Sequence, residues 1–186
     1  MIKLIAFDLV GVLVNEKDIE LTPEEDKLER MFGKNINDSD YLLEARKIIN
    51  KDSILMRTIE NLIDKLYQVK DVDLFKKIKE KNSHLKIIIA TNHVSFVRNF
   101  IGETLEIEYL EDILISSEIH KVKPNADFYK YILDKFKILP EELLFLDDNI
   151  ENIESAKKLG INTIKVDKDT NLYEKIDQWL DSEKNI

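Results

Sequence analysis

The chain has 186 residues, of which 28 are Lys or Arg and 37 are Asp or Glu, so its formal net charge is −9. It contains no Cys, 3 His and 4 Gly, which excludes disulfide bonds, a thiol nucleophile, cysteine-bound zinc and a glycine-rich dinucleotide loop. The negative charge argues against non-specific binding to nucleic acids or anionic membranes, which requires a basic surface. The apolar stretch at Met1–Phe7 is too short for a signal-peptide core. We therefore expect one cytoplasmic domain, or one domain carrying an insertion.

Four short apolar runs are typical of buried parallel strands: Ile2–Phe7, Lys86–Ala90, Leu143–Leu146 and Asn162–Val166. A weaker run spans Ile113–Ile115. Continuous apolar residues indicate burial on both faces, as in a parallel sheet covered by helices. Because each run is followed by a helical pattern, we predict an α/β fold with a Rossmann-like, doubly wound parallel sheet.

The segment from about Asn15 to Asn82 is rich in helix formers and shows no strand run. Its first helix is predicted to begin at the capping box Thr22–Glu25, which has Pro at the first helical position, and to end at Gly33. Two amphipathic stretches follow, around residues 42–49 and 54–66, with apolar residues three or four positions apart.

This segment is much longer than the dozen or so residues that a direct crossover between parallel strands needs. The excess predicts a helical subdomain inserted over the end of the sheet. We expect residues 1–14 and 83–186 to form the α/β core and residues 15–82 to form this helical cap.

Ligands of open α/β sheets bind beyond the carboxyl ends of the strands, so the residues at those ends are candidates for chemistry. Four clusters lie there: Asp8–Leu13, Thr91–His93, Lys121–Pro124 and Asp147–Asn149. A carboxylate at a strand end can attack phosphorus, and a Lys and a Thr hydroxyl can hold phosphate oxygens. Three neighbouring carboxylates need a cation, and oxygen ligands without His or Cys favour Mg²⁺. The clusters therefore indicate phosphoryl transfer.

The same clusters, in this order, resemble the four motifs of the haloacid dehalogenase (HAD) superfamily, in its phosphatase-type branch. Asp8–Leu13 resembles the first motif, Thr91–Asn92 the second, Ser116–Pro124 the third and Phe145–Asn149 the fourth. The resemblance extends from Ile2 to about residue 166, and the insert lies where that family places a helical cap. The order disfavours a receiver domain, which places its Lys after its Thr and acidic residues.

The resemblance implies a role for each matching residue. Asp8 would be the nucleophile. Thr91 and the backbone N–H of Asn92 would bind the transferred phosphoryl group, and Lys123 would neutralise it. The Mg²⁺ ligands would be the carboxylates of Asp8, Asp147 and Asp148 and the backbone carbonyl of Val10. Asp147 would bind the ion directly or through water.

One departure from the family concerns Val10, which stands where the phosphatases usually carry a second Asp as general acid and base. Acid–base assistance accelerates such reactions typically ~10²–10⁴-fold, so we expect slow hydrolysis unless Asn15, Glu16 or His93 substitutes. His93 and His84 are otherwise interpreted as surface or loop residues.

The predicted function is Mg²⁺-dependent hydrolysis of a small phosphorylated metabolite through an aspartyl phosphate at Asp8. Two alternatives stay open. A protein with Val10 at that position could bind phosphate or regulate a partner without turnover. A haloacid dehalogenase also lacks the second Asp and needs no metal, but its fourth motif has no acidic pair, so Asp147–Asp148 favours the phosphatase.

Overall fold

A five-stranded parallel sheet forms the centre of the protein. The structure is a computed structural model that describes residues 1–183. The strand order of the sheet is β5-β4-β1-β6-β7, and every neighbouring pair is parallel. The strands are β1 (Leu4–Phe7), β4 (Lys86–Thr91), β5 (Asp112–Ile115), β6 (Leu143–Asp147) and β7 (Asn162–Lys165). All five predicted strands and the doubly wound parallel sheet are confirmed.

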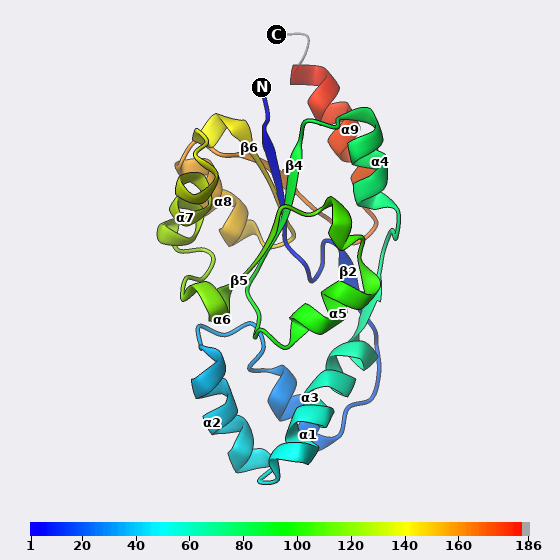
Figure 1. The fold of residues 1–186 in the computed structure, drawn as a ribbon, viewed down its shortest axis with the longest axis vertical. Helices are drawn as coiled ribbons and strands as arrows, with labels where there is room; N and C mark the ends of the chain where they lie inside the picture. The colour runs from blue at the N-terminus through cyan, green and yellow to red at the C-terminus, as the bar shows by residue number, and fades with distance from the viewer. Residues whose placement is uncertain (184–186) are drawn as a thin grey trace.

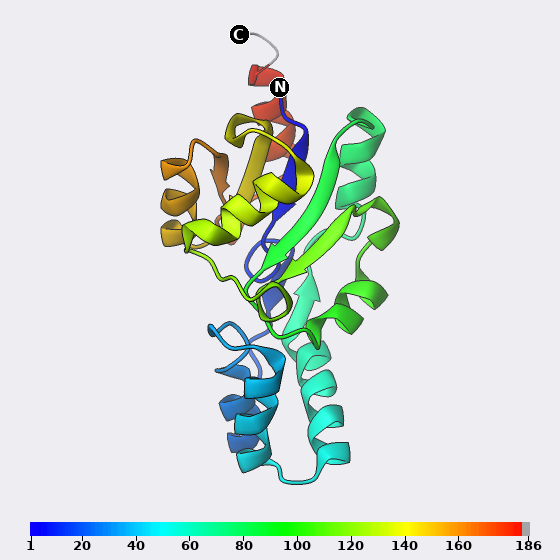
Figure 2. The same ribbon diagram turned by 60° about the vertical axis from the view of Figure 1, so that its left-hand side comes forward.

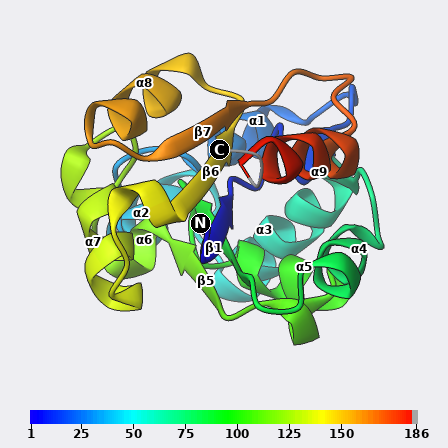
Figure 3. The ribbon, with the colours of Figure 1, turned by 90° about the horizontal axis from the view of Figure 1, so that it is seen from above.

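Alternate residues of the central strand enter two separate cores, one on each face of the sheet. Ile5 and Phe7 point into a core with helices α4 (Leu74–Lys81), α5 (Val97–Thr104) and α9 (Leu172–Glu183). Figures 1 and 3 show α4 and α9 together on this side of the sheet.

The other face of the sheet packs against α7 (Ala126–Phe136) and α8 (Ile150–Lys158). Leu4 and Ala6 of β1 lie in this second core with side chains of both helices. Burial of β1 on both faces explains why its apolar run is continuous rather than alternating. Three short helices complete the α/β part: α6 (Ser116–Ile119) and the 3₁₀ turns η1 (Ile107–Tyr109) and η2 (Pro140–Glu142).

Three helices lie beyond the carboxyl ends of the strands, at the bottom of Figures 1 and 2. They are α1 (Pro23–Glu29), α2 (Asp38–Ile48) and α3 (Asp52–Leu66). The predicted capping box is present, because the Glu25 N–H donates to Thr22 Oγ1 and the Thr22 N–H donates to Glu25 Oε2. We refer to these three helices as the helical layer.

A two-stranded antiparallel sheet connects the helical layer to the main sheet. It consists of β2 (Val14–Glu16) and β3 (Tyr67–Val69), with Glu16 opposite Tyr67. The expectation of no strand in this segment was wrong, because a three-residue strand is too short to produce a recognisable apolar run. Helix α1 also ends at Glu29 rather than at Gly33, and the chain continues through i→i+3 turn bonds at Met31 and Phe32.

Helix α4, which falls inside the predicted cap range of residues 15–82, packs on the main sheet. Its Phe75 ring lies 5.6 Å from the ring of Phe7 in β1. Lys81 at its end forms ion pairs with Asp177 and Asp181 of α9. The division of the chain into core and cap stays a prediction, and these contacts favour a boundary before α4. None of the described helices is long and apolar enough to span a membrane.

Candidate active site

The carboxyl ends of β1 and β6 bring three carboxylates together. Asp8 follows β1, Asp147 ends β6, and Asp148 is the next residue. One carboxylate oxygen from each residue can be chosen so that all three lie within 4.8 Å of one another. This oxygen-only donor set suits a hard divalent cation such as Mg²⁺. The structure thus assembles the three side chains of the predicted metal site.

A single buried ammonium group bridges two of these carboxylates. Lys123 Nζ lies 2.8 Å from Asp8 Oδ1 and 2.7 Å from Asp147 Oδ2, and the Lys123 side chain is only 1% exposed. Burial by itself lowers the pKa of Lys123, but the charges of Asp8 and Asp147 outweigh it and the pKa is raised. Three carboxylates facing one ammonium leave two uncompensated negative charges, which a divalent cation would balance.

The pKa of the Asp8 carboxyl group is shifted by its surroundings. Burial raises its pKa to about 6, the Lys123 charge acts in the opposite direction, and the Asp147 charge adds to the rise. Its Oδ1 also accepts a hydrogen bond from the Leu9 N–H, at 2.8 Å. A perturbed carboxylate at a strand end beside a Lys is a common property of catalytic groups.

Asp147 has all its oxygen lone pairs engaged by protein donors. It is fully buried and accepts from the Asn149 N–H at 2.8 Å and from Lys123 Nζ. Asn152 Nδ2 donates to both of its oxygens, at 3.0 and 3.1 Å. A carboxylate has about four lone-pair sites, so Asp8 and Asp148 are better suited than Asp147 to direct metal contact. Sequence reasoning missed this role of Asn152.

Asn92 positions Lys123 through its side chain. Asn92 Nδ2 donates to the Lys123 carbonyl at 2.9 Å, and the Lys123 N–H donates to Asn92 Oδ1, also at 2.9 Å. This reciprocal pair connects the end of β4 to the loop that carries the lysine. The sequence had indicated only the backbone N–H of Asn92. Thr91, the last residue of β4, is buried at 1% exposure.

His93 lies in the loop after β4, as one of the two predicted alternatives had it, but it is buried rather than at the surface; His84 is exposed. The His93 ring lies 4.9 Å from the ring of Phe32 in the helical layer. Its Nδ1 is 3.0 Å from the Val94 carbonyl, which can only accept, so Nδ1 carries the hydrogen and Nε2 accepts from the Tyr67 hydroxyl at 2.9 Å.

Burial lowers the pKa of His93 to about 4. The ring is therefore neutral at physiological pH and has both nitrogens engaged. It cannot serve as the general acid that Val10 leaves missing.

Gly11 is required by the close approach of Asp148. Its φ of +80° lies in the left-handed region, and a Cβ atom at this position would stand 2.3 Å from Asp148 Oδ2. Lys70, which follows β3, donates from Nζ to the Gly11 carbonyl at 2.6 Å. The turn after Asp8 is therefore packed directly against a proposed metal ligand.

We predict that Gly11→Ala reduces Mg²⁺ affinity and catalytic turnover and lowers the free energy of unfolding by about 1–3 kcal/mol, because the new methyl group displaces Asp148 and strains the turn. Gly102→Ala is the matched control, since a Cβ there meets nothing within 4 Å and Gly102 lies inside α5. The control should be neutral or stabilised by up to about 1 kcal/mol. Urea unfolding measures the change in unfolding free energy, and calorimetric titration measures the change in Mg²⁺ affinity. Equal changes in the two variants would contradict the claim that Gly11 is required by the close approach of Asp148.

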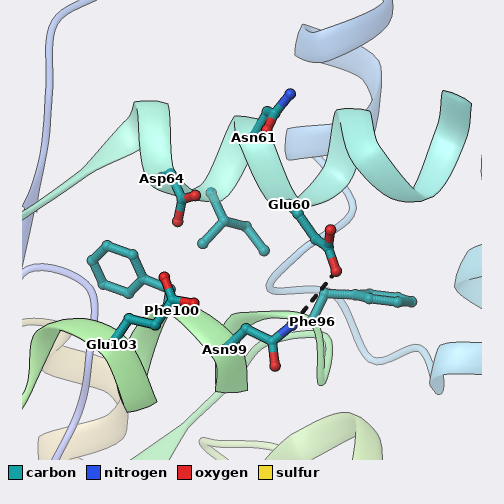
Figure 4. A pocket seen from close by; sticks show the side chains of 8 residues that line it. Glu60, Asn61, Asp64, Phe96, Asn99, Phe100 and Glu103 are labelled. Atoms are coloured by element: carbon teal, nitrogen blue, oxygen red, sulfur yellow. Dashed lines mark hydrogen bonds between the residues drawn. The ribbon is translucent and has the colours of Figure 1, made fainter.

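Two of the hollows in the described structure differ in how they lie relative to the three carboxylates. One, of about 240 Å³, borders them and is lined by Gly11, Asn15, Glu16, Asp148 and Lys168. The other, of about 160 Å³, lies between α3 and α5 and is shown in Figure 4. Glu60, Asp64 and Glu103 face this second hollow, and Asn99 Nδ2 donates to Glu60 Oε1 at 3.5 Å. None of the predicted site residues lines the second hollow, so the first is the candidate entrance to the site.

The sequence matches a family model described as haloacid dehalogenase-like hydrolase over residues 5–166. Among curated proteins, the phosphorylated carbohydrates phosphatase of Thermotoga maritima is 24% identical over 135 residues, covering 66% of this chain and 59% of that protein. The bifunctional epoxide hydrolase 2 of Rattus norvegicus is 35% identical over 59 residues, which are 32% of this chain but only 11% of that protein.

Solved structures share the fold along most of the chain. A predicted HAD-like family hydrolase from Porphyromonas gingivalis superposes with a TM-score of 0.76 at 20% identity, covering 97% of this chain and 98% of that one. A HAD family enzyme from Bacteroides thetaiotaomicron, in complex with magnesium and inorganic phosphate, gives 0.73 at 21% identity, with 92% and 97% coverage. An L-2-haloacid dehalogenase from Xanthobacter autotrophicus gives 0.63 at 15% identity, with 93% and 80% coverage.

The protein thus has an α/β fold with a cluster of carboxylates at the carboxyl ends of its parallel strands. The chain belongs to the haloacid dehalogenase-like hydrolase family, since the family model covers most of its length. The predicted membership is thus confirmed.

Proposed function

We propose that the protein is a Mg²⁺-dependent phosphatase that hydrolyses a small phosphate monoester through an aspartyl phosphate on Asp8. The observation that carries this proposal is the cluster of three carboxylates, whose oxygens lie within 4.8 Å of one another around a single ammonium group. Relatives described as a phosphorylated carbohydrates phosphatase and a D-ribitol-5-phosphate phosphatase support the substrate class.

In the proposed reaction each residue acts on the phosphoryl group from a fixed position. An Asp8 carboxylate oxygen attacks phosphorus, and the P–O bond to the leaving group breaks. Thr91 and the Asn92 N–H bind the phosphoryl oxygens, and Lys123 offsets their charge. Water then attacks phosphorus, which releases phosphate and restores Asp8.

The metal would be held by Asp8, Asp148 and the Val10 carbonyl, and Asp147 would mainly hold Lys123. Bound Mg²⁺ supplies positive charge that favours the ionised form of Asp8 and neutralises the phosphate. We propose that the helical layer covers this site and selects the substrate.

A second candidate function is binding of a phosphorylated ligand without turnover, and it is favoured by Val10. An apolar side chain can neither protonate a leaving alkoxide nor deprotonate water. Dehalogenation is less well supported, because attack of Asp8 on carbon needs no metal and makes no use of the acidic pair Asp147 and Asp148.

The experiment that tests these candidates is release of p-nitrophenol from p-nitrophenyl phosphate, with Mg²⁺ and with EDTA. This substrate has a good leaving group that needs little protonation, so turnover that depends on Mg²⁺ is expected even with Val10. Absence of turnover while phosphate still binds would favour the binding protein. Metal-independent chloride release from 2-chloropropionate would overturn the phosphatase proposal. A subsequent screen of phosphorylated metabolites would identify the substrate.

A further inference from the structure

The structure leaves one acidic residue suited to replace the acid–base group that Val10 lacks. Of the three substitutes considered from sequence, His93 is buried and neutral, with both ring nitrogens engaged. Asn15 has an amide, which does not exchange a proton usefully at neutral pH. Glu16 remains, and it lines the hollow beside Asp148 and Gly11.

Glu16 is an exposed residue of β2 and lies on the same face of the β2–β3 pair as Tyr67. Glu16 and Tyr67 are directly opposite in the antiparallel pair, and such residues project from the same face. The Tyr67 hydroxyl contacts His93, which follows Thr91 and Asn92 at the end of β4. Glu16 therefore shares its face with a side chain that reaches the phosphate-binding loop.

The electrostatic surroundings agree with this placement. Burial raises the pKa of Tyr67, and the charges of Glu16, Glu29 and Asp8 raise it further, so all three carboxylates are near its hydroxyl. Burial, followed by the charge of Glu16, also raises the pKa of Glu29, at the end of α1. Glu16 and Glu29 therefore lie close enough to interact electrostatically.

Two other titratable groups line the hollow: Asp148, which we propose as a metal ligand, and Lys168. A lysine ammonium group can donate a proton but has no lone pair with which to accept one. The two steps of an aspartyl-phosphate mechanism need donation first and acceptance afterwards. A carboxyl group does both.

Resting on the phosphatase function proposed above, we propose that Glu16 is the general acid and base of this enzyme. In the first step Asp8 attacks phosphorus, the P–O bond to the alcohol breaks, and the leaving oxygen takes the proton of the Glu16 carboxyl group. In the second step the Glu16 carboxylate takes a proton from water as its oxygen attacks phosphorus. The bond from Asp8 to phosphorus breaks, phosphate leaves, and Glu16 is protonated again.

The test is Glu16→Gln, measured as leaving-group release in the first turnover with p-nitrophenyl phosphate and with phenyl phosphate in Mg²⁺. Phenolate is the poorer leaving group, so phenol release should slow by about 10²-fold or more, while p-nitrophenol release changes less than about tenfold. Glu16→Asp should recover part of the loss. Glu20→Gln is the control, because it removes an exposed carboxylate from the same connecting segment and should leave both rates unchanged.

Equal slowing of both substrates by Glu16→Gln, or no slowing of either, would overturn the role of Glu16. In those cases Asp8-dependent turnover by the unaltered protein would still support the phosphatase function. Failure of the unaltered protein to release either phenol would instead overturn both proposals.

Discussion

Asp8→Asn is expected to reduce Mg²⁺-dependent turnover of p-nitrophenyl phosphate by at least about 10³-fold. The amide is a poor nucleophile, and the remaining groups can bind the phosphoryl group but cannot form the covalent intermediate. Asp134→Asn is the matched control, because this exposed carboxylate on α7 lies outside the site and its loss should leave turnover unchanged. Retained activity in Asp8→Asn would remove Asp8 from the role of nucleophile.

The same substitution has an expected effect on stability in metal-free protein. The folded-state pKa of Asp8, about 6, lies above its ordinary value of 3.8, so between these pH values the folded state binds more protons than the unfolded state. The contribution of Asp8 to stability is thus present below pH 3.8 and is lost as pH rises through 6. Across this window the free energy of unfolding of the unaltered protein should fall by at most about 3 kcal/mol relative to that of Asp8→Asn.

Urea unfolding of both proteins in EDTA, at several pH values from 3.5 to 7, measures this difference in unfolding free energy. If the unfolding free energy of the unaltered protein rose relative to that of Asp8→Asn as pH increased, the assigned direction of the pKa shift would be contradicted.

Lys123→Met is expected to lower the free energy of unfolding in EDTA by about 3–5 kcal/mol and to abolish turnover. The substitution leaves Asp8 and Asp147 buried without their shared cation, and uncompensated buried charges are strongly destabilising. Lys121→Met is the control on the same loop, because its ion pair with Asp127 is 3.7 Å long and partly exposed. Loss of that pair should cost about 1 kcal/mol or less.

Addition of Mg²⁺ separates this electrostatic account from simple loss of packing. In Lys123→Met the carboxylates of Asp8 and Asp147 lose their shared ammonium group, so Mg²⁺ should raise the melting temperature more than it does in the unaltered protein. An equal or smaller rise would show that Lys123 stabilises the protein by packing and not by charge.

The main sheet could be predicted from sequence because each strand is buried on both faces. This burial produces continuous apolar runs such as Leu143–Leu146, and it places polar residues at known positions after them. Asp8, Thr91 and Asp147 were found in this way, since parallel strands end at one edge. The loop that carries Lys123 was placed at the same edge by the same argument, and the structure brings Lys123 into contact with Asp8 and Asp147.

What could not be predicted depends on contacts between distant segments. The burial of His93 results from Phe32 and Tyr67, which pack on it only after the helical layer folds back over the sheet. The short strand β3 is defined by its pairing with β2 rather than by its own residues. For the same reason no local pattern distinguishes Glu16 from the other carboxylates of its segment.

The most direct test of the central claim is mass spectrometry of peptides from protein quenched in acid during turnover of p-nitrophenyl phosphate with Mg²⁺. The account predicts one phosphoryl group on the peptide that contains Asp8, absent when the reaction contains EDTA and absent from Asp8→Asn. Turnover without a phosphorylated peptide, or a phosphoryl group attached to a different residue, would contradict it.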